Sequence, residues 1–268
     1  MKSDEYWQMR ALQREKESHG TAADTALRLR LLYEQADKDL QKQIHKIFHA
    51  YVDYTGVDEQ KAHELLSVQE TAELLAELRK QYEETGDAKA LAQLNAPAYG
   101  YRISRLQAAR RAIKAELDKL AAQEEKTGTG QLVKTYDKSY YKTMYDTLPE
   151  LPGTPFVPLS QDVMHQAIQN KWKGENYSSR VWKNRDKLVS EGGKIIDAGV
   201  TSGKSIQQMT TELSDLMDVG SYAAARLIRT EVNRMHNDAA LESYKAMGVK
   251  EYTYLATLDA RTCAVCGA

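Results

Sequence analysis

Hydrophobic residues recur at alternating intervals of three and four along the early part of the chain, with polar residues between them. This period places the apolar side chains on one helical face, close to a heptad seam. The pattern predicts one helix from about Thr21 to Tyr54, roughly 50 Å long at 1.5 Å per residue, which suits a bundle or coiled coil. Its apolar positions are Leu29, Tyr33, Ala36, Leu40, Ile44, Ile47 and Tyr51.

Two further helices are predicted before residue 126. Ser67 and Glu70 fit a capping box, so one helix is expected to begin near Ser67 and to end near Glu84. The other spans residues 99–125, and the glycine-rich stretch 127–130 is expected to break it. The first 126 residues therefore predict an antiparallel helical hairpin or bundle.

Tyrosines and prolines follow in two regular patterns. The tyrosines lie on one face of a helix, which favours a buried stripe over an interface. Four of the five prolines are spaced by three, the repeat of polyproline II, so a stiff extended spacer is predicted. A docking ligand for an aromatic groove is the alternative. The residues are Tyr136, Tyr140, Tyr141 and Tyr145, then Pro149, Pro152, Pro155 and Pro158.

The last hundred residues again show helical periods. A helix is predicted over residues 177–198, followed by a turn at 199–203 and a second capping box at 205–208 that begins a short amphipathic helix. A longer helix begins at Ser221 and ends at Gly248, because glycine readily adopts the left-handed conformation that closes a helix. Alternating aromatic and β-branched residues then predict a strand over 251–258.

The helix that begins at Ser221 has two distinct faces. Its apolar stripe predicts a core contact, and a separate polar stripe is rich in hydrogen-bond donors. The polar stripe suits contact with a phosphate or with a protein, although internal ion pairs with Glu231 or Asp238 are the alternative. The apolar stripe is Ile228, Val232, Met235 and Ala239, and the polar stripe is Arg226, Arg229, Asn233 and Asn237.

Composition restricts the function classes. The 268 residues carry 37 basic and 38 acidic side chains, so no whole-molecule field attracts nucleic acid or anionic lipid. No apolar run is long enough to span a bilayer, which predicts a soluble chain made in the cytoplasm. Prolines occur only between Pro97 and Pro158, so the predicted class is mainly α.

Three parts are expected along the chain. Residues 1–130 form an elongated helical bundle or coiled coil, and residues 131–160 form the tyrosine-rich segment and the proline-rich spacer. Residues 161–268 form a small α-helical unit that ends in a short β segment and Cys263-Ala-Val-Cys266.

Two motifs near the C-terminal end resemble a known family. Arg-Thr-Glu-x-Asn-Arg at residues 229–234, followed by Asp-x-Arg-Thr-Cys-x-x-Cys at 259–266, is similar to the minor head, or head morphogenesis, proteins of tailed bacteriophages, the Mu F-like family. The resemblance implies a non-enzymatic component of the virion or procapsid, made in the host cytoplasm and acting near the portal in head morphogenesis and in DNA packaging or ejection.

The resemblance also implies partners. The expected protein partner is the portal protein, a scaffold protein or the major capsid protein. A weak local contact with phage DNA and a homo-oligomer are further options, and no contact with a membrane is expected. Two alternatives stay open: the chain is the first part of an effector with a downstream enzyme such as an ADP-ribosyltransferase, or it is a nucleic-acid-binding module. No catalytic set is legible in the sequence.

The cysteine pair has the spacing of one half of a structural zinc site. Two thiolates separated by two residues can occupy two corners of a tetrahedron. A redox role fits less well, because no helix N-terminus follows to lower the pKa of a thiol. The resemblance places the remaining ligands downstream, so no cofactor is expected in the chain as given, and zinc is expected only in a longer form.

Overall fold

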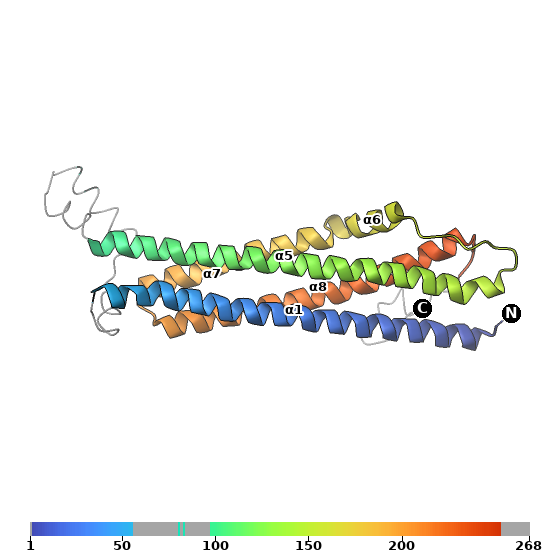
Figure 1. Ribbon diagram of the computed structural model, residues 1–268, viewed down its shortest axis with the longest axis horizontal. Coiled ribbons are helices and arrows are strands. Elements are labelled where there is room, and N and C mark those ends of the chain that lie inside the picture. The colour runs from blue at the N-terminus through green and yellow to red at the C-terminus, as the bar shows by residue number, and fades with distance from the viewer. Residues whose placement is uncertain (1, 56–79, 81–82, 84–96, 253–268) are drawn as a thin grey trace. The chain divides into compact units, whose positions relative to one another are not determined.

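The chain is mainly α-helical, as predicted. The computed structural model describes residues 2–55, 80, 83 and 97–252 (Figure 1), and the described residues include no strand. The helix predicted over 67–84 lies almost entirely outside them. The elements are α1 (Asp4–Thr55), α5 (Pro97–Thr147), η1 (Leu148–Glu150), α6 (Gln161–Gln169), η2 (Trp172–Gly174), α7 (Tyr177–Ser202) and α8 (Ile206–Ala246).

Helix α1 confirms the first predicted helix and extends it towards the N-terminus by more than four turns. The predicted seam is buried through Ile44, and Phe48 then takes the inward position in place of Ile47. Small residues, Ala22 and Ala26, continue the buried face upstream. The apolar period therefore identifies the packed face, while alanines extend it beyond the stretch where large side chains mark it.

The predicted break at residues 127–130 is wrong, because α5 runs through it without interruption. Each glycine costs a helix about 1 kcal/mol relative to alanine. Gly128 is nevertheless required by packing, since a Cβ there would overlap the hydroxyl of Tyr177. The glycine that weakens the helix locally is the one that admits the Tyr177 side chain.

Helix α8 joins two helices that the sequence predicts separately. It begins with the predicted capping box: Gln208 N donates to Ser205 Oγ at 3.1 Å, and Ser205 N donates to Gln208 Oε1 at 2.8 Å. It passes through Gly220, where a Cβ would lie 2.8 Å from the Tyr33 ring. Gly248 ends it as predicted, with φ of 72°.

The proline-rich segment is not an extended rod. Its start folds into η1, and Gly153 (φ 85°) turns the chain. The part that follows packs back on α5: Tyr140 Oη donates to the Val157 carbonyl at 3.0 Å, and Leu159 N donates to Tyr141 Oη at 3.1 Å. The segment is therefore docked by the tyrosines, because their hydroxyls bond the backbone groups that a solvated rod would expose.

Two compact units divide the described chain. Unit 1 comprises residues 1–28, 126–179 and 225–268, and unit 2 comprises residues 29–125 and 180–224. These units do not follow the predicted sequential division at residues 130 and 160. The physical reason is that α1, α5 and α8 each contribute one part to each unit, so a unit is assembled from segments distant in sequence.

Unit 2 is built from parts of α1, α5, α7 and α8. Contacts between α1 and α5 run in opposite sequence directions, from Tyr33–Glu124 to Gln43–Glu116, so these two helices are antiparallel. Helix α7 runs antiparallel to α5 and α8 antiparallel to α1, as further polar contacts show. These are Trp182–Glu125, Arg185–Asp118 and Arg110–Asp197 for the first pair, and Gln41–Ser214 and the Gly220 approach to Tyr33 for the second.

The most deeply buried of the acidic side chains described in unit 2 is Glu124. Glu124 is 1% exposed, and its Oε2 accepts a hydrogen bond from Tyr33 Oη at 2.8 Å. Burial raises the pKa of Glu124 to about 7, against the opposing effect of the Tyr33 hydrogen bond. This side chain therefore changes charge near neutral pH.

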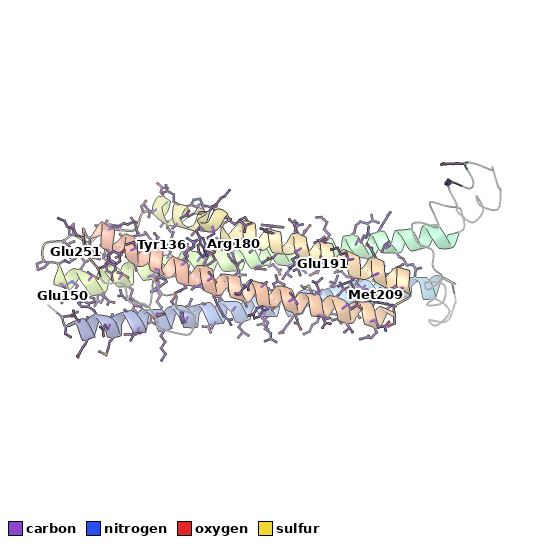
Figure 2. The ribbon with its side chains drawn as sticks, turned by 180° about the vertical axis from the view of Figure 1, so that it is seen from behind. Tyr136, Glu150, Arg180, Glu191, Met209 and Glu251 are labelled. Carbon is purple, nitrogen blue, oxygen red and sulfur yellow. The ribbon has the colours of Figure 1, made fainter. Side chains whose placement is uncertain are left out.

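Unit 1 joins the first half of α1 to the second half of α5. Arg10 pairs with Asp146, Arg14 Nη1 donates to Thr143 Oγ1 at 3.2 Å, and Lys142 Nζ donates to Glu17 at 2.6 Å. The descending numbers on α5 again show an antiparallel pair. Helix α8 completes the unit through a 2.8 Å contact between His236 Nδ1 and Ser139 Oγ. Figure 2 shows the side chains along the helices from the opposite side.

Candidate functional site

The apolar stripe of α8 is buried as predicted. Ile228, Val232, Met235 and Ala239 are all 0% exposed. Their spacing of four, three and four holds them on one side of the helix, which packs into the core. This contact fixes the rotation of α8, and it therefore decides which of its other residues reach solvent.

Two residues of the Arg-Thr-Glu-x-Asn-Arg motif form a buried clamp. Glu231 is 0% exposed and accepts a hydrogen bond from Trp172 Nε1 at 2.9 Å and one from Arg234 Nε at 3.0 Å. Arg234 Nη1 also donates to the Ala167 carbonyl at 3.3 Å and to Asp238 Oδ2 at 3.0 Å. The clamp ties α6 and η2 to α8, and its buried charges are compensated by one another.

The sequence offered ion pairs with Glu231 or Asp238 as the alternative role of the polar stripe. These ion pairs form, but their cation is Arg234, which is not a member of the stripe. Glu231 and Asp238 were both candidate partners, and Arg234 contacts both. Trp172 was missed. No periodicity marks it, because it lies in a short 3₁₀ helix far from the motif in sequence.

The polar stripe lies at the surface of unit 1. Arg226, Arg229 and Asn237 are exposed, and Asn233 is half-buried. Within the described part of the chain, none of these four side chains makes an ion pair or a side-chain hydrogen bond. The stripe thus presents two guanidinium groups and two amides to solvent, donors that suit the carboxylates or phosphates of another molecule.

The predicted metal ligands are not among the described residues. Cys263, Cys266 and nearly all of the predicted strand fall outside the described residues, so both predictions stay untested. Over residues 2–55 and 97–252, no group of three or more histidine, cysteine or acidic side chains could hold a metal ion. In the same ranges, no helix is long and apolar enough to cross a membrane.

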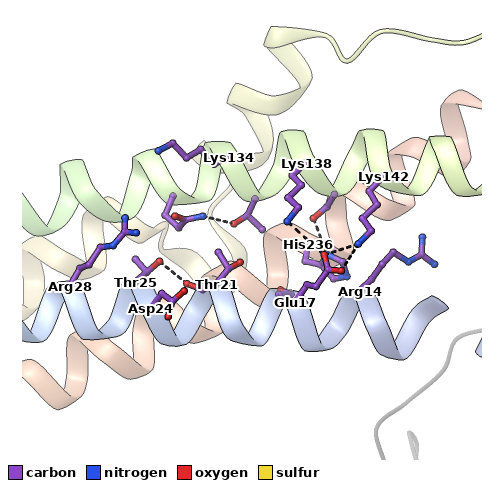
Figure 3. Close-up of a pocket in the computed structure, with 14 residues that line it drawn as sticks. Arg14, Glu17, Thr21, Asp24, Thr25, Arg28, Lys134, Lys138, Lys142 and His236 are labelled. Atoms are coloured by element: carbon purple, nitrogen blue, oxygen red, sulfur yellow. Dashed lines mark hydrogen bonds and ion pairs between the residues drawn. The ribbon is translucent and has the colours of Figure 1, made fainter. Parts of the chain in front are cut away.

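A polar groove lies in unit 1 between α1 and α5, with His236 of α8 at its wall (Figure 3). Its volume is about 310 Å³. Sequence analysis missed it, because its walls are more than a hundred residues apart in the chain and each wall reads as an ordinary polar helix face. Helical spacing along each wall was the available signal, but only the antiparallel pairing brings the two faces together.

Residues 193–268 match the family described as Phage Mu protein F like protein. This stretch includes the end of α7 from residue 193, all of α8 and both motifs that carry the resemblance. The resemblance to the Mu F-like family is confirmed for this part of the chain, and it supports a phage head-related protein.

One curated relative is an enzyme. The chain is 27% identical over 144 residues to the NAD(+)--arginine ADP-ribosyltransferase EFV of Enterococcus faecalis, covering 52% of this chain and 29% of that protein. The chain thus spans less than a third of the relative it matches. No solved structure matches the chain.

Proposed function

Starting from the Mu F-like segment at residues 193–268, we propose that the chain is a minor head protein of a tailed phage that acts near the portal during head morphogenesis and in DNA packaging or ejection. The observation that carries the proposal is that this segment contains the whole of α8, including the exposed polar stripe. The proposed location is the procapsid and then the virion. The proposed role is binding, without catalysis by this chain.

The stripe is the proposed contact surface. The Glu231–Arg234 clamp and the buried apolar face hold α8 in one orientation, so the stripe is presented without further ordering. Its donors suit an acidic surface on the portal protein, a scaffold protein or the major capsid protein. Two arginines neutralise few phosphates, so any contact with DNA is expected to be weak and lost steeply with salt.

Incorporation into procapsids tests the proposal. Arg226→Gln with Arg229→Gln removes both guanidinium groups from the stripe, and we expect copies per procapsid to fall about tenfold, the effect of losing roughly 1.4 kcal/mol. Arg30→Gln with Arg111→Gln is the matched control, because these arginines are exposed on α1 and α5 of unit 2. Equal incorporation of both variants would contradict the stripe as the contact surface, and absence of the unchanged protein from procapsids would contradict the function.

A second candidate function rests on the enzymatic relative. In this candidate the chain is the first part of a phage-derived effector, followed by an enzyme such as the arginine ADP-ribosyltransferase to which it is 27% identical over 144 residues. The test is to read the encoding frame beyond Ala268 and to assay NAD consumption by the longest chain. Release of nicotinamide in the presence of an arginine acceptor would support this candidate, and a frame that encodes no further domain would reject it.

We also propose that Cys263 and Cys266 supply half of a divided zinc site. The spacing suits two corners of a tetrahedron, and two thiolates alone bind zinc far less well than four ligands. We expect elemental analysis to find little zinc in the 268-residue chain and about one zinc per chain in a form extended through downstream ligands, with loss in Cys263→Ser. An extended form without zinc would make the cysteines a packing pair.

A further inference from the structure

The groove of unit 1 carries an excess of positive charge. Five basic side chains line it, against the carboxylates of Glu17 and Asp24. The basic residues come from two helices that line the same groove, so their charges gather around one space. They are Arg14 and Arg28 on α1, and Lys134, Lys138 and Lys142 on α5.

The carboxylate nearest to these lysines is already compensated. Lys142 Nζ lies 2.6 Å from Glu17 Oε2, and Lys138 Nζ lies 3.7 Å from the same atom. The Lys142 hydrogen bond lowers the pKa of Glu17, so this acid stays ionised and remains paired with lysine. Figure 3 shows Lys138 and Lys142 reaching from α5 towards Glu17 on α1.

Two other cations of the groove have no ion-pair partner among the described residues, whereas Arg14 has one. Arg28 and Lys134 are exposed and make no ion pair within the described residues. Arg14 is buried, and its Nη1 lies 4.0 Å from Asp146 Oδ2. Arg28 and Lys134 are opposed in the lining by Asp24, so the groove keeps an excess of positive charge.

The cations of the groove also affect the charge state of His236. Burial, with Arg14 as the next cause and Lys142 adding to it, lowers the pKa of His236 to about 4. The ring is therefore neutral at physiological pH, and its Nδ1 is held 2.8 Å from Ser139 Oγ. A neutral imidazole is compatible with a bound anion, because it carries no negative charge that would compete for the cations and it can take part in hydrogen bonds.

Hydroxyl groups complete the lining, and one of them lacks a partner. Ser18 is 7% exposed, lines the groove, and its Oγ makes no hydrogen bond to any described residue. A buried polar group without a hydrogen-bond partner destabilises the folded chain, so such a hydroxyl points to a ligand. Thr21, Thr25, Thr135 and Ser139 line the same space.

We propose that this groove binds the phosphate group of a phosphorylated small molecule of nucleotide size. Lysine and arginine are the side chains that proteins use for phosphate, and hydroxyls donate the additional hydrogen bonds. The volume of about 310 Å³ lies at the lower end of small-molecule pockets and favours a small phosphate compound over a nucleic-acid strand. The site is distinct from the α8 stripe, so it adds a ligand to a protein whose proposed role is assembly.

Calorimetric titration of the full chain tests this proposal at low salt, with pyrophosphate and ADP as probes. We expect one site per chain. Lys134→Gln with Lys138→Gln should raise the Kd about tenfold or more, because charge-assisted contacts are lost. The matched control is Lys16→Gln with Lys126→Gln, two exposed lysines on the same two helices outside the groove, and we expect its Kd to stay within about twofold.

Ser18→Ala separates binding from folding. Removal of the buried hydroxyl should raise the Tm of the ligand-free chain and weaken ADP binding several-fold, whereas a merely structural hydroxyl would leave the Kd unchanged. Absence of binding by both probes, or equal weakening by the groove and control pairs, would overturn the proposal. So would a short single-stranded oligonucleotide that binds more tightly than ADP and is lost in the groove variant, because the ligand would then be a phosphodiester strand.

Discussion

Glu124 makes the stability of unit 2 depend on pH. Its pKa is raised from 4.5 to about 7 by burial, so the folded chain holds this proton more tightly than the unfolded chain does. The contribution to stability is greatest below pH 4.5, where both states are protonated. It is lost as pH rises from about 4.5 through the folded pKa of about 7, and the loss is nearly complete by about pH 8.

The size of the effect follows from that difference. One pKa unit corresponds to about 1.4 kcal/mol, so the full loss is about 3 kcal/mol and most of it falls between about pH 5 and pH 8. Glu124→Gln keeps an acceptor oxygen for Tyr33 Oη but cannot ionise. The variant should therefore lack this part of the pH dependence, whatever constant change in stability the amide introduces.

Urea unfolding followed by circular dichroism measures the free energy of unfolding at pH values of about 5 and 8. We expect the difference between Glu124→Gln and the unchanged protein to grow by about 2–3 kcal/mol from about pH 5 to pH 8 in favour of the variant. Glu34→Gln, a substitution of a partly exposed acid on α1, is the control and should give a nearly constant difference. Parallel pH curves for Glu124→Gln and the unchanged protein would refute the reasoning.

Two further predictions concern packing and the clamp. Gly128→Ala should destabilise the chain by about 1–3 kcal/mol, because its Cβ would overlap the Tyr177 hydroxyl. Gly130→Ala, whose Cβ would meet nothing within 4 Å, should instead stabilise the chain by up to about 1 kcal/mol. Thermal unfolding measures both variants, and equal destabilisation by the two would contradict the packing argument. Arg234→Met should cost about 3–5 kcal/mol in urea unfolding, because it leaves the Glu231 carboxylate buried without its cation, and a loss below about 1 kcal/mol would show that other groups neutralise Glu231.

Local signals predicted the helix ends and the buried faces. The Ser205–Gln208 capping box and the Gly248 stop depend only on residues within one or two turns, so their hydrogen bonds can be inferred without knowing the fold. The apolar stripe of α8 was predictable for the same reason. A helical period states which side chains share a face, and a continuous apolar face has to be buried.

Local signals failed where a tertiary contact outweighed them. Gly128 lies in a predicted break and Gly220 lies between two helices that the sequence predicts separately, yet both lie inside long helices. A tyrosine ring occupies the space that a side chain at either position would fill. The proline repeat predicted a rod, but the hydroxyls of Tyr140 and Tyr141 hold it against α5. Propensity differences of about 1 kcal/mol per residue are smaller than the energy of burying an aromatic side chain.

The same limit applies to the functional residues. The sequence by itself determined that Arg226 and Arg229 share a polar helical face and that the Arg-Thr-Glu-x-Asn-Arg motif resembles a phage head family. Only the tertiary structure decided that Arg234 belongs to a buried clamp and that the lysines of α5 face Arg14 of α1 across a groove. The physical reason is that charge and hydrogen-bonding capacity are properties of single residues, whereas their partners are set by antiparallel packing between segments more than a hundred residues apart.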